Sequence, residues 1–229
     1  MMRHSIYIIA FLLITTFGTN MKAQTSENQK TLRYLALGDS YTIGESVAES
    51  ERWPVYLAAR LASEGMSIES PKIIAKTGWR TDQLQEAIES DPQARGDWDL
   101  VSLLIGVNNQ YQGKTVESYE IEFNRLVQMA LKLAGGDAKK VFIVSIPDYG
   151  KTPFGASKEA KIEKELKAYN KVNKAIAKKY NIQYFNITPI SAKAKNDPEL
   201  VADDTLHPSG KMYKAWVDMM FNKVLKMVK

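Results

Sequence analysis

The fold is decided by residues 32–40, which read Leu-Arg-Tyr-Leu-Ala-Leu-Gly-Asp-Ser. A short apolar run that stops at glycine and aspartate is typical of a buried β-strand followed by a turn. Residues 100–105 repeat the pattern, interrupted only by Ser102, and indicate a central strand that is buried on both faces. The strand at residues 32–37 therefore ends in a loop that carries Ser40.

Strands and helices alternate outward from these two runs. Further strands are expected at residues 72–75, 141–146 and 183–186. Helices are expected at residues 53–64, 81–90, 116–134, 156–180 and 209–228. This alternation predicts an α/β fold in which a parallel sheet of about five strands has helices on both faces. In such sheets, ligands bind beyond the carboxyl ends of the strands.

The bulk composition fits one globular domain, which we assign to residues 32–229 after a polar leader at residues 24–31. Of the 229 residues, 45% are hydrophobic and 25% are charged, so a sizeable core is available. The net charge of +5 is spread along the chain, which argues against nucleic acid as a partner. Lysines and glutamates are mixed in the helix at residues 156–180, as expected for a solvated face.

Residues 1–23 are typical of an export signal. A basic start precedes an apolar run at residues 6–17, and the chain then turns polar around Ala23. The apolar run is shorter than the span of about 20 residues that crosses a membrane. We expect an exported protein, periplasmic or secreted, with no membrane span after signal removal. The alternative interpretation is an uncleaved N-terminal anchor.

Cysteine and histidine usage narrows the chemistry. The chain has no cysteine, which excludes disulfides, thiolate metal sites and a cysteine nucleophile. Its two histidines are His4, inside the predicted signal, and His207. A metal site that needs two histidines is therefore excluded from the mature chain, and any mechanism that uses histidine must use His207.

Polar residues at the predicted strand ends supply the parts needed for acyl transfer. A serine such as Ser40 is a weak nucleophile until a base takes its proton, and His207 titrates in the right range to be that base. The imidazole needs a carboxylate to fix its tautomer. Asp204, three residues before His207, has the better spacing for this role than Asp203. Ser40 could instead be a turn residue, and His207 a surface residue before Pro208.

An oxyanion would need preorganised hydrogen-bond donors. The candidates are the backbone N–H groups of Ser40 and Gly78 and the side-chain amide of Asn108. The alternative for Gly78 is an ordinary turn glycine, and for Asn108 it is a loop amide. Candidates for contact with substrate are Tyr41, Trp79, Arg80 and Tyr111. The alternative for Trp79 is packing, and for Arg80 it is solvation.

The segment Gly38-Asp39-Ser40-Tyr41 near the start and Asp204-x-x-His207 near the end resemble the GDSL-type SGNH hydrolase family. That family has four sequence motifs, which contain in order a serine, a glycine, an asparagine and a histidine. They map onto Ser40, Gly78, Asn108 and His207, and the resemblance covers residues 32–229. It implies a flavodoxin-like three-layer α/β/α sandwich, no metal or other cofactor, and hydrolysis of esters or thioesters. Asn109 departs from the family pattern, which usually has aspartate there. The asparagine or serine that often precedes the glycine of the second motif is also missing.

These residues favour a serine esterase that works through an acyl-Ser40 intermediate. We expect short acyl or acetylated-carbohydrate esters, because no long hydrophobic insert is present to cover an acyl tail. The alternatives are a lysophospholipase or acyl thioesterase, so the substrate is a small-molecule, lipid or glycan ester. A hypothesis of another class is a non-catalytic module that binds a glycan or lipid on the same fold.

Overall fold

A computed structural model of the protein describes Met1 and residues 30–229. Apart from Met1, the predicted signal peptide at residues 1–23 therefore lies outside the described residues, as does most of the predicted polar leader at residues 24–31. Within the described part, no helix has the length and apolar character needed to cross a membrane.

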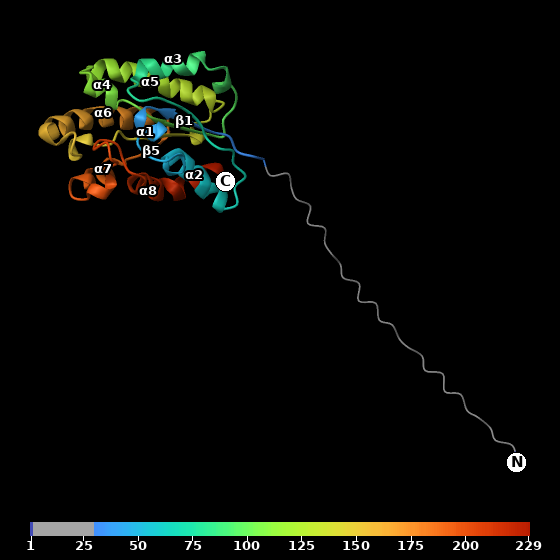
Figure 1. Ribbon diagram of the computed structural model, residues 1–229. Coiled ribbons are helices and arrows are strands. Elements are labelled where there is room, and N and C mark those ends of the chain that lie inside the picture. The colour runs from blue at the N-terminus through green and yellow to red at the C-terminus, as the bar shows by residue number, and fades with distance from the viewer. Residues whose placement is uncertain (2–29) are drawn as a thin grey trace.

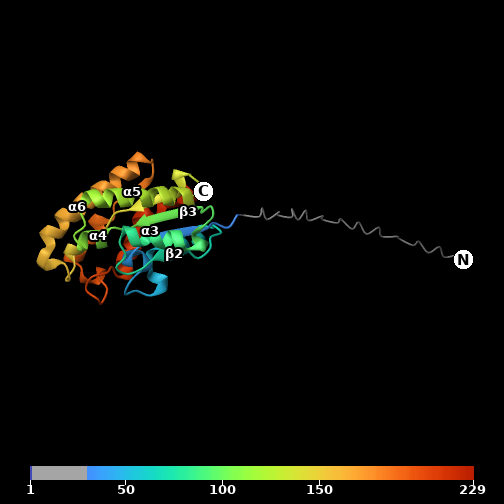
Figure 2. The ribbon, with the colours of Figure 1, turned by 90° about the horizontal axis from the view of Figure 1, so that it is seen from above.

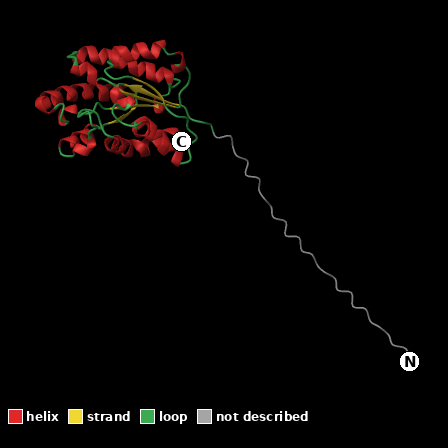
Figure 3. Cartoon of the chain, in the orientation of Figure 1, coloured by secondary structure: helices red, strands yellow, loops and turns green. Residues whose placement is uncertain are grey.

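A parallel sheet forms the centre of the described domain (Figure 3). Its five strands are β1 (Tyr34–Gly38), β2 (Lys72–Ala75), β3 (Leu100–Leu104), β4 (Val141–Val144) and β5 (Gln183–Phe185). Their order across the sheet is β2-β1-β3-β4-β5, and every pair is parallel. All residues of β1, β3 and β4 are buried, as the apolar runs of β1 and β3 predicted. The register sets Gly38 level with Ala75 and Leu104, so three loops start side by side.

Long amphipathic helices cover both faces of this sheet and confirm the predicted three-layer sandwich (Figures 1 and 2). On one face α5 (Val116–Leu133) packs against α3 (Thr81–Ser90) and α6 (Glu159–Lys179). On the other face α2 (Trp53–Ser63) packs against α8 (Gly210–Val228). Apolar stripes explain the packing, since α8 buries Met212, Trp216 and Val224 toward the core.

Three short helices near strand ends were not predicted: α1 (Ser40–Ile43), α4 (Val107–Tyr111) and α7 (Thr188–Ser191). Helices of four or five residues contain too few positions to show a helical repeat in sequence. The first two follow β1 and β3 at once, and Figure 1 shows α1 beside the end of β1. They carry the two segments in which the sequence placed Ser40 and Asn108.

Candidate active site

Ser40 is the first residue of α1, where the chain leaves β1. Asp39 caps this helix, because its Oδ1 accepts the Tyr41 N–H at 3.0 Å. Gly44 ends the helix in a left-handed conformation with φ of 71°. A Cβ on Gly38 would lie 2.4 Å from the Leu104 carbonyl oxygen, so only glycine fits between the two strands. The tight turn holds Ser40, 5% exposed, at the carboxyl edge of the sheet.

Asp204 and His207 meet in the loop before α8. Asp204 Oδ1 accepts the backbone N–H groups of Leu206 and His207, each at 2.9 Å. Its Oδ2 lies 2.6 Å from His207 Nδ1. A carboxylate only accepts, so the neutral imidazole carries its proton on Nδ1 and leaves Nε2 free to accept one. Asp203, the competing candidate, is exposed and its side chain has no hydrogen bond with any described residue.

Ser46 is a further residue at this carboxylate, and no motif or spacing in the sequence pointed to it. Its Oγ donates to Asp204 Oδ2 at 2.6 Å across 158 positions of sequence. Burial acts to raise the pKa of Asp204, but the bonds from Ser46, the two backbone N–H groups and His207 outweigh it and hold the pKa well below its usual range. Asp204 is therefore ionised throughout the working range of an imidazole base.

One cavity of about 200 Å³ brings several of the predicted residues together. Ser40, Gly78, Asn108 and His207 all line it. The remaining lining residues are Tyr41, Thr77, Val107, Tyr111, Tyr149, Phe154 and Leu206. Four segments that are distant in sequence thus converge on one small hollow beyond the strand ends, as expected for ligand sites in parallel sheets.

The three candidate oxyanion donors differ in how they are held. Gly78 has φ of 83°, and a Cβ there would meet nothing within 4 Å, so its conformation and not its surroundings requires glycine. No described residue accepts its N–H. Asn108 Nδ2 donates to the Trp79 carbonyl at 2.9 Å, which orients the amide and leaves a second N–H for a ligand. As the first residue of α1, Ser40 has an N–H without an intrahelical acceptor.

Asn109 joins the glycine loop to the Asn108 loop. Its Oδ1 accepts the Thr81 N–H at 3.1 Å, and its Nδ2 donates to Thr81 Oγ at 2.6 Å. The same Nδ2 lies 3.2 Å from Glu122 Oε2, which also accepts from the Thr81 hydroxyl. Asn109 and Thr81 are fully buried, whereas Glu122 is partly exposed and lies 3.6 Å from Lys114 Nζ. The two loops are therefore joined by polar contacts that start in the core and end at the surface.

The candidate substrate contacts divide into two pairs. Tyr41 and Tyr111 line the 200 Å³ cavity, and the Tyr41 ring lies 5.5 Å from the ring of His207. Trp79 and Arg80 are not among the lining residues. Trp79 is packed against the core. Arg80 holds both carboxylate oxygens of Asp82, at 3.0 and 2.8 Å, as a planar guanidinium does with a close acid.

Asp39 is the other acid of the site and directly precedes Ser40 in the chain. It is fully buried, and its Oδ2 has no hydrogen-bond partner among the described residues. Burial raises the pKa of Asp39 to about 7, against the opposing effect of backbone N–H groups from Tyr41 and Gly106. No group of three potential metal-ligating side chains occurs in residues 30–229.

Comparison with known proteins places these features in a family. Residues 36–215 match the model of the GDSL-like Lipase/Acylhydrolase family, which is most of the chain. A comparison with curated proteins finds no match. Among solved structures, TesA is 17% identical with a TM-score of 0.66, over 86% of this chain and 99% of that chain.

Two acetyl xylan esterases are also similar in structure. The enzyme AlAXEase is 18% identical with a TM-score of 0.67, over 84% of this chain and 100% of its own. A variant of Axe2 from Geobacillus stearothermophilus is 19% identical with a TM-score of 0.66, over 84% of this chain and 94% of its own. At these identities the likeness establishes the fold, and the family model establishes the kinship. The chain belongs to the GDSL-like lipase/acylhydrolase family and is a serine hydrolase that acts on ester bonds.

Proposed function

We propose that the protein is a serine esterase in which Ser40 is the nucleophile, His207 the base and Asp204 the residue that orients the base. The observation that carries this proposal is the 2.6 Å contact between Asp204 Oδ2 and His207 Nδ1 beside a cavity that Ser40 also lines. Within residues 30–229, His207 is the only histidine, so no other imidazole is available there.

In the first half-reaction Ser40 Oγ bonds to the ester carbonyl carbon while its proton passes to His207 Nε2. The carbonyl electron pair moves onto oxygen, where the N–H groups of Ser40 and Gly78 and the Asn108 amide stabilise the negative charge. The tetrahedral species then collapses by breaking the bond to the alcohol oxygen. The leaving alcohol takes the proton from His207, and the acyl group remains on Ser40.

In the second half-reaction water replaces the alcohol. His207 takes a proton from the water as its oxygen bonds to the acyl carbon, and the same donors hold the oxyanion. Collapse breaks the bond to Ser40 Oγ, which recovers its proton from His207, and a carboxylic acid leaves. Asp204 stays ionised through both halves and stabilises the imidazolium that forms in each.

Short acyl chains and acetylated carbohydrates are the proposed substrates. A cavity of about 200 Å³ lies below the usual range of about 300–1,000 Å³ for pockets that enclose drug-sized ligands. Such a space suits an acetyl or similarly small acyl group. The resemblance to two acetyl xylan esterases supports the same choice, although it extends only to the fold. The proposal that this activity is periplasmic or secreted is supported only by the export-signal pattern at residues 1–23.

A chain-length series of 4-nitrophenyl esters, from acetate to palmitate, tests this proposal on residues 24–229. We expect the highest kcat/KM for acetate or butyrate and its loss in a folded Ser40→Ala variant. A preference for long chains would favour a lysophospholipase, and a preference for a matched thioester would favour a thioesterase. Folded protein that hydrolyses none of these compounds would favour a non-catalytic binding module.

A further inference from the structure

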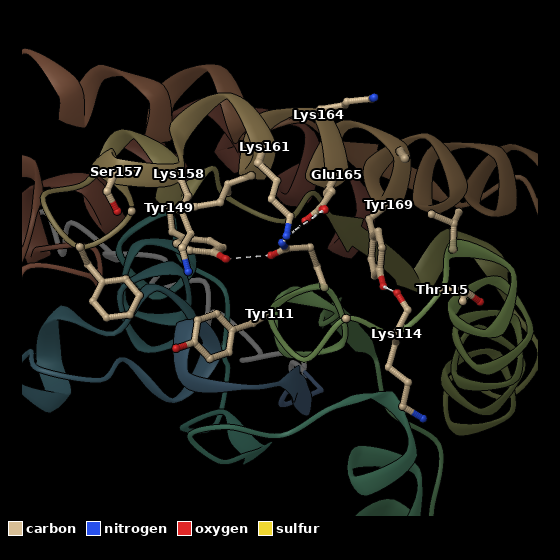
Figure 4. A pocket seen from close by; sticks show the side chains of 17 residues that line it. Tyr111, Lys114, Thr115, Tyr149, Ser157, Lys158, Lys161, Lys164, Glu165 and Tyr169 are labelled. Atoms are coloured by element: carbon tan, nitrogen blue, oxygen red, sulfur yellow. Dashed lines mark hydrogen bonds and ion pairs between the residues drawn. The ribbon is translucent and has the colours of Figure 1, made fainter.

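A second, larger hollow adjoins the candidate active site (Figure 4). Its volume is about 490 Å³, and it lies between α4, α6 and the segment that precedes α6. The two hollows share Tyr111, Tyr149 and Phe154 as lining residues. A molecule that has its ester group beside Ser40 could therefore extend past these rings into the larger space.

The shared wall exposes aromatic rings to solvent. Tyr111 is 61% exposed and Phe154 is 48% exposed, whereas large apolar side chains elsewhere in the described domain are mostly buried. Their ring centroids lie 6.4 Å apart, and buried Tyr149 supports both at 6.3 and 6.4 Å. Exposed apolar groups that gather at one place mark a binding surface. Flat rings of this kind can stack against the apolar face of a sugar ring.

Two lysines supply positive charge to the same hollow. Both Lys158 and Lys161 line it, and Figure 4 shows Lys161 ending beside Glu165 while Lys164 points away from the hollow. Lys158 has no ion-pair partner among residues 30–229. It also occupies the N-cap of α6 without a side-chain cap, where serine, threonine or aspartate would stabilise the helix. Stabilisation of α6 therefore does not explain a lysine at position 158.

The nearby acids compensate this charge only in part. Glu165 accepts from Gln110 Nε2 at 2.6 Å and lies 3.9 Å from Lys161 Nζ, at the limit of an ion pair. Glu159 and Glu163 are both held by Lys151 Nζ at 2.6 Å. Lys158, and in part Lys161, thus remain available to an anion that enters the hollow.

We propose that the larger hollow binds the alcohol part of the ester and that this part is an acidic sugar unit. The ring stacks on Tyr111 and Phe154, and its carboxylate accepts hydrogen bonds from Lys158 and Lys161. This assignment rests on the proposed function, because it requires the acyl group to occupy the small cavity beside Ser40. It adds a substrate class to that function: acylated polysaccharides that contain uronic acids.

A matched pair of substrates tests the charge requirement. One is an acetylated galacturonate oligosaccharide, and the other is the same compound with its carboxylates converted to amides. We measure acetate release by the purified protein and compare the two kcat/KM values. At about 20 mM salt we expect the carboxylate form to be better by at least about fivefold, and the advantage to shrink at about 0.5 M salt.

Two double variants locate the effect. In Lys158→Gln/Lys161→Gln the ratio of the two kcat/KM values should fall to near one. The control is Lys171→Gln/Lys174→Gln, which removes the same charge from exposed positions on the same helix and should keep the wild-type ratio. A wild-type ratio near one, or a ratio that survives loss of Lys158 and Lys161, would overturn the proposal.

Two further arms separate the possible causes of failure. If 4-nitrophenyl acetate is hydrolysed but the ratio is one, only the acidic-sugar proposal fails; if no acetyl ester is hydrolysed, the proposed function fails. Acetylated glucose 6-phosphate, compared with acetylated glucose, tests phosphate as the source of negative charge. If only the phosphorylated substrate has a higher kcat/KM than its uncharged partner, the uronic-acid assignment is overturned. The hollow would then bind phosphorylated alcohols.

Discussion

At the level of single residues, the two carboxyl groups next to the proposed nucleophile and base have pKa values shifted in opposite directions. Asp39 precedes Ser40, and Asp204 contacts His207. Asp204 receives four hydrogen bonds and has a lowered pKa. Asp39 is fully buried, has one oxygen without a partner and has a pKa raised to about 7. Hydrogen bonds to its charged form lower the pKa of Asp204, whereas loss of solvation raises the pKa of Asp39.

The raised pKa of Asp39 predicts that the protein loses stability as the pH rises. Between the unfolded value near 3.8 and the folded value of about 7, the folded state binds the proton more tightly. Folding therefore takes up a proton, and the free energy of unfolding falls with pH in this window by at most about 4 kcal/mol. Above about pH 7 the loss from this group is complete.

Asp39→Asn removes this titration and keeps an oxygen for the Tyr41 N–H. We expect its free energy of unfolding to exceed that of the wild type by a margin that grows from about pH 4 to pH 8. Urea titrations at several pH values measure the margin, with Asp203→Asn as an exposed control. Parallel stability curves for Asp39→Asn and the wild type would show that folding does not raise the pKa of Asp39.

Ser46 is expected to act on catalysis through Asp204. Because its φ is 64°, Ser46→Gly removes the hydroxyl without forcing a new side chain into a left-handed conformation. Losing a hydrogen bond to a charged group should lower kcat/KM for 4-nitrophenyl acetate about tenfold. Asn181→Gly, at φ 56° after α6, is the matched control and should keep full activity. Equal activity of both variants would show that Ser46 has no part in orienting Asp204.

At the scale of elements, the site depends on how α3 and α4 are joined. Asn109 of α4 bonds Thr81, the first residue of α3, and Glu122 of α5 closes the network. The resemblance to the SGNH family places aspartate at position 109. In this chain an aspartate would set a second carboxylate about 3.2 Å from Glu122, so the asparagine and the glutamate are matched to each other.

A double-mutant cycle tests this match. Asn109→Asp alone should lower both the urea midpoint and kcat/KM, the latter at least about tenfold, because repulsion displaces the loops of Gly78 and Asn108. Adding Glu122→Gln should recover most of the loss, with a coupling free energy of about 1–3 kcal/mol. Additive effects of the two changes would mean that the residues do not interact, contrary to the observed network.

The long elements were predictable from sequence, and the short ones were not. Continuous apolar runs fixed β1, β3 and β4, and spaced apolar residues fixed α5 and α8 to within one or two residues at each end. The helix predicted at residues 156–180 instead begins at Glu159, after a separate 3-10 turn at Ala156–Lys158. Turns and four-residue helices depend on local capping, which a periodicity of 3.6 residues does not reveal.

At the scale of the whole molecule, the parallel register explains why a sequence can indicate its own site. Because Gly38, Ala75 and Leu104 lie level across the sheet, the segments that follow them must share one edge. That rule was enough to expect Ser40, Gly78 and Asn108 together. It could not indicate Ser46, whose contact with Asp204 spans 158 positions, nor that Arg80 is engaged by Asp82. Such contacts depend on side-chain packing that only the folded chain defines.

The proposed function depends on attack of Ser40, activated by His207, on an acyl carbon. Treatment with a fluorophosphonate probe followed by intact-mass spectrometry tests this step, with peptide mapping to locate the adduct. We expect one adduct per chain on Ser40, none in folded Ser40→Ala, and labelling slowed by about a thousandfold or more in His207→Ala. An unlabelled but folded wild-type protein, or an adduct on another residue, would contradict the proposed function.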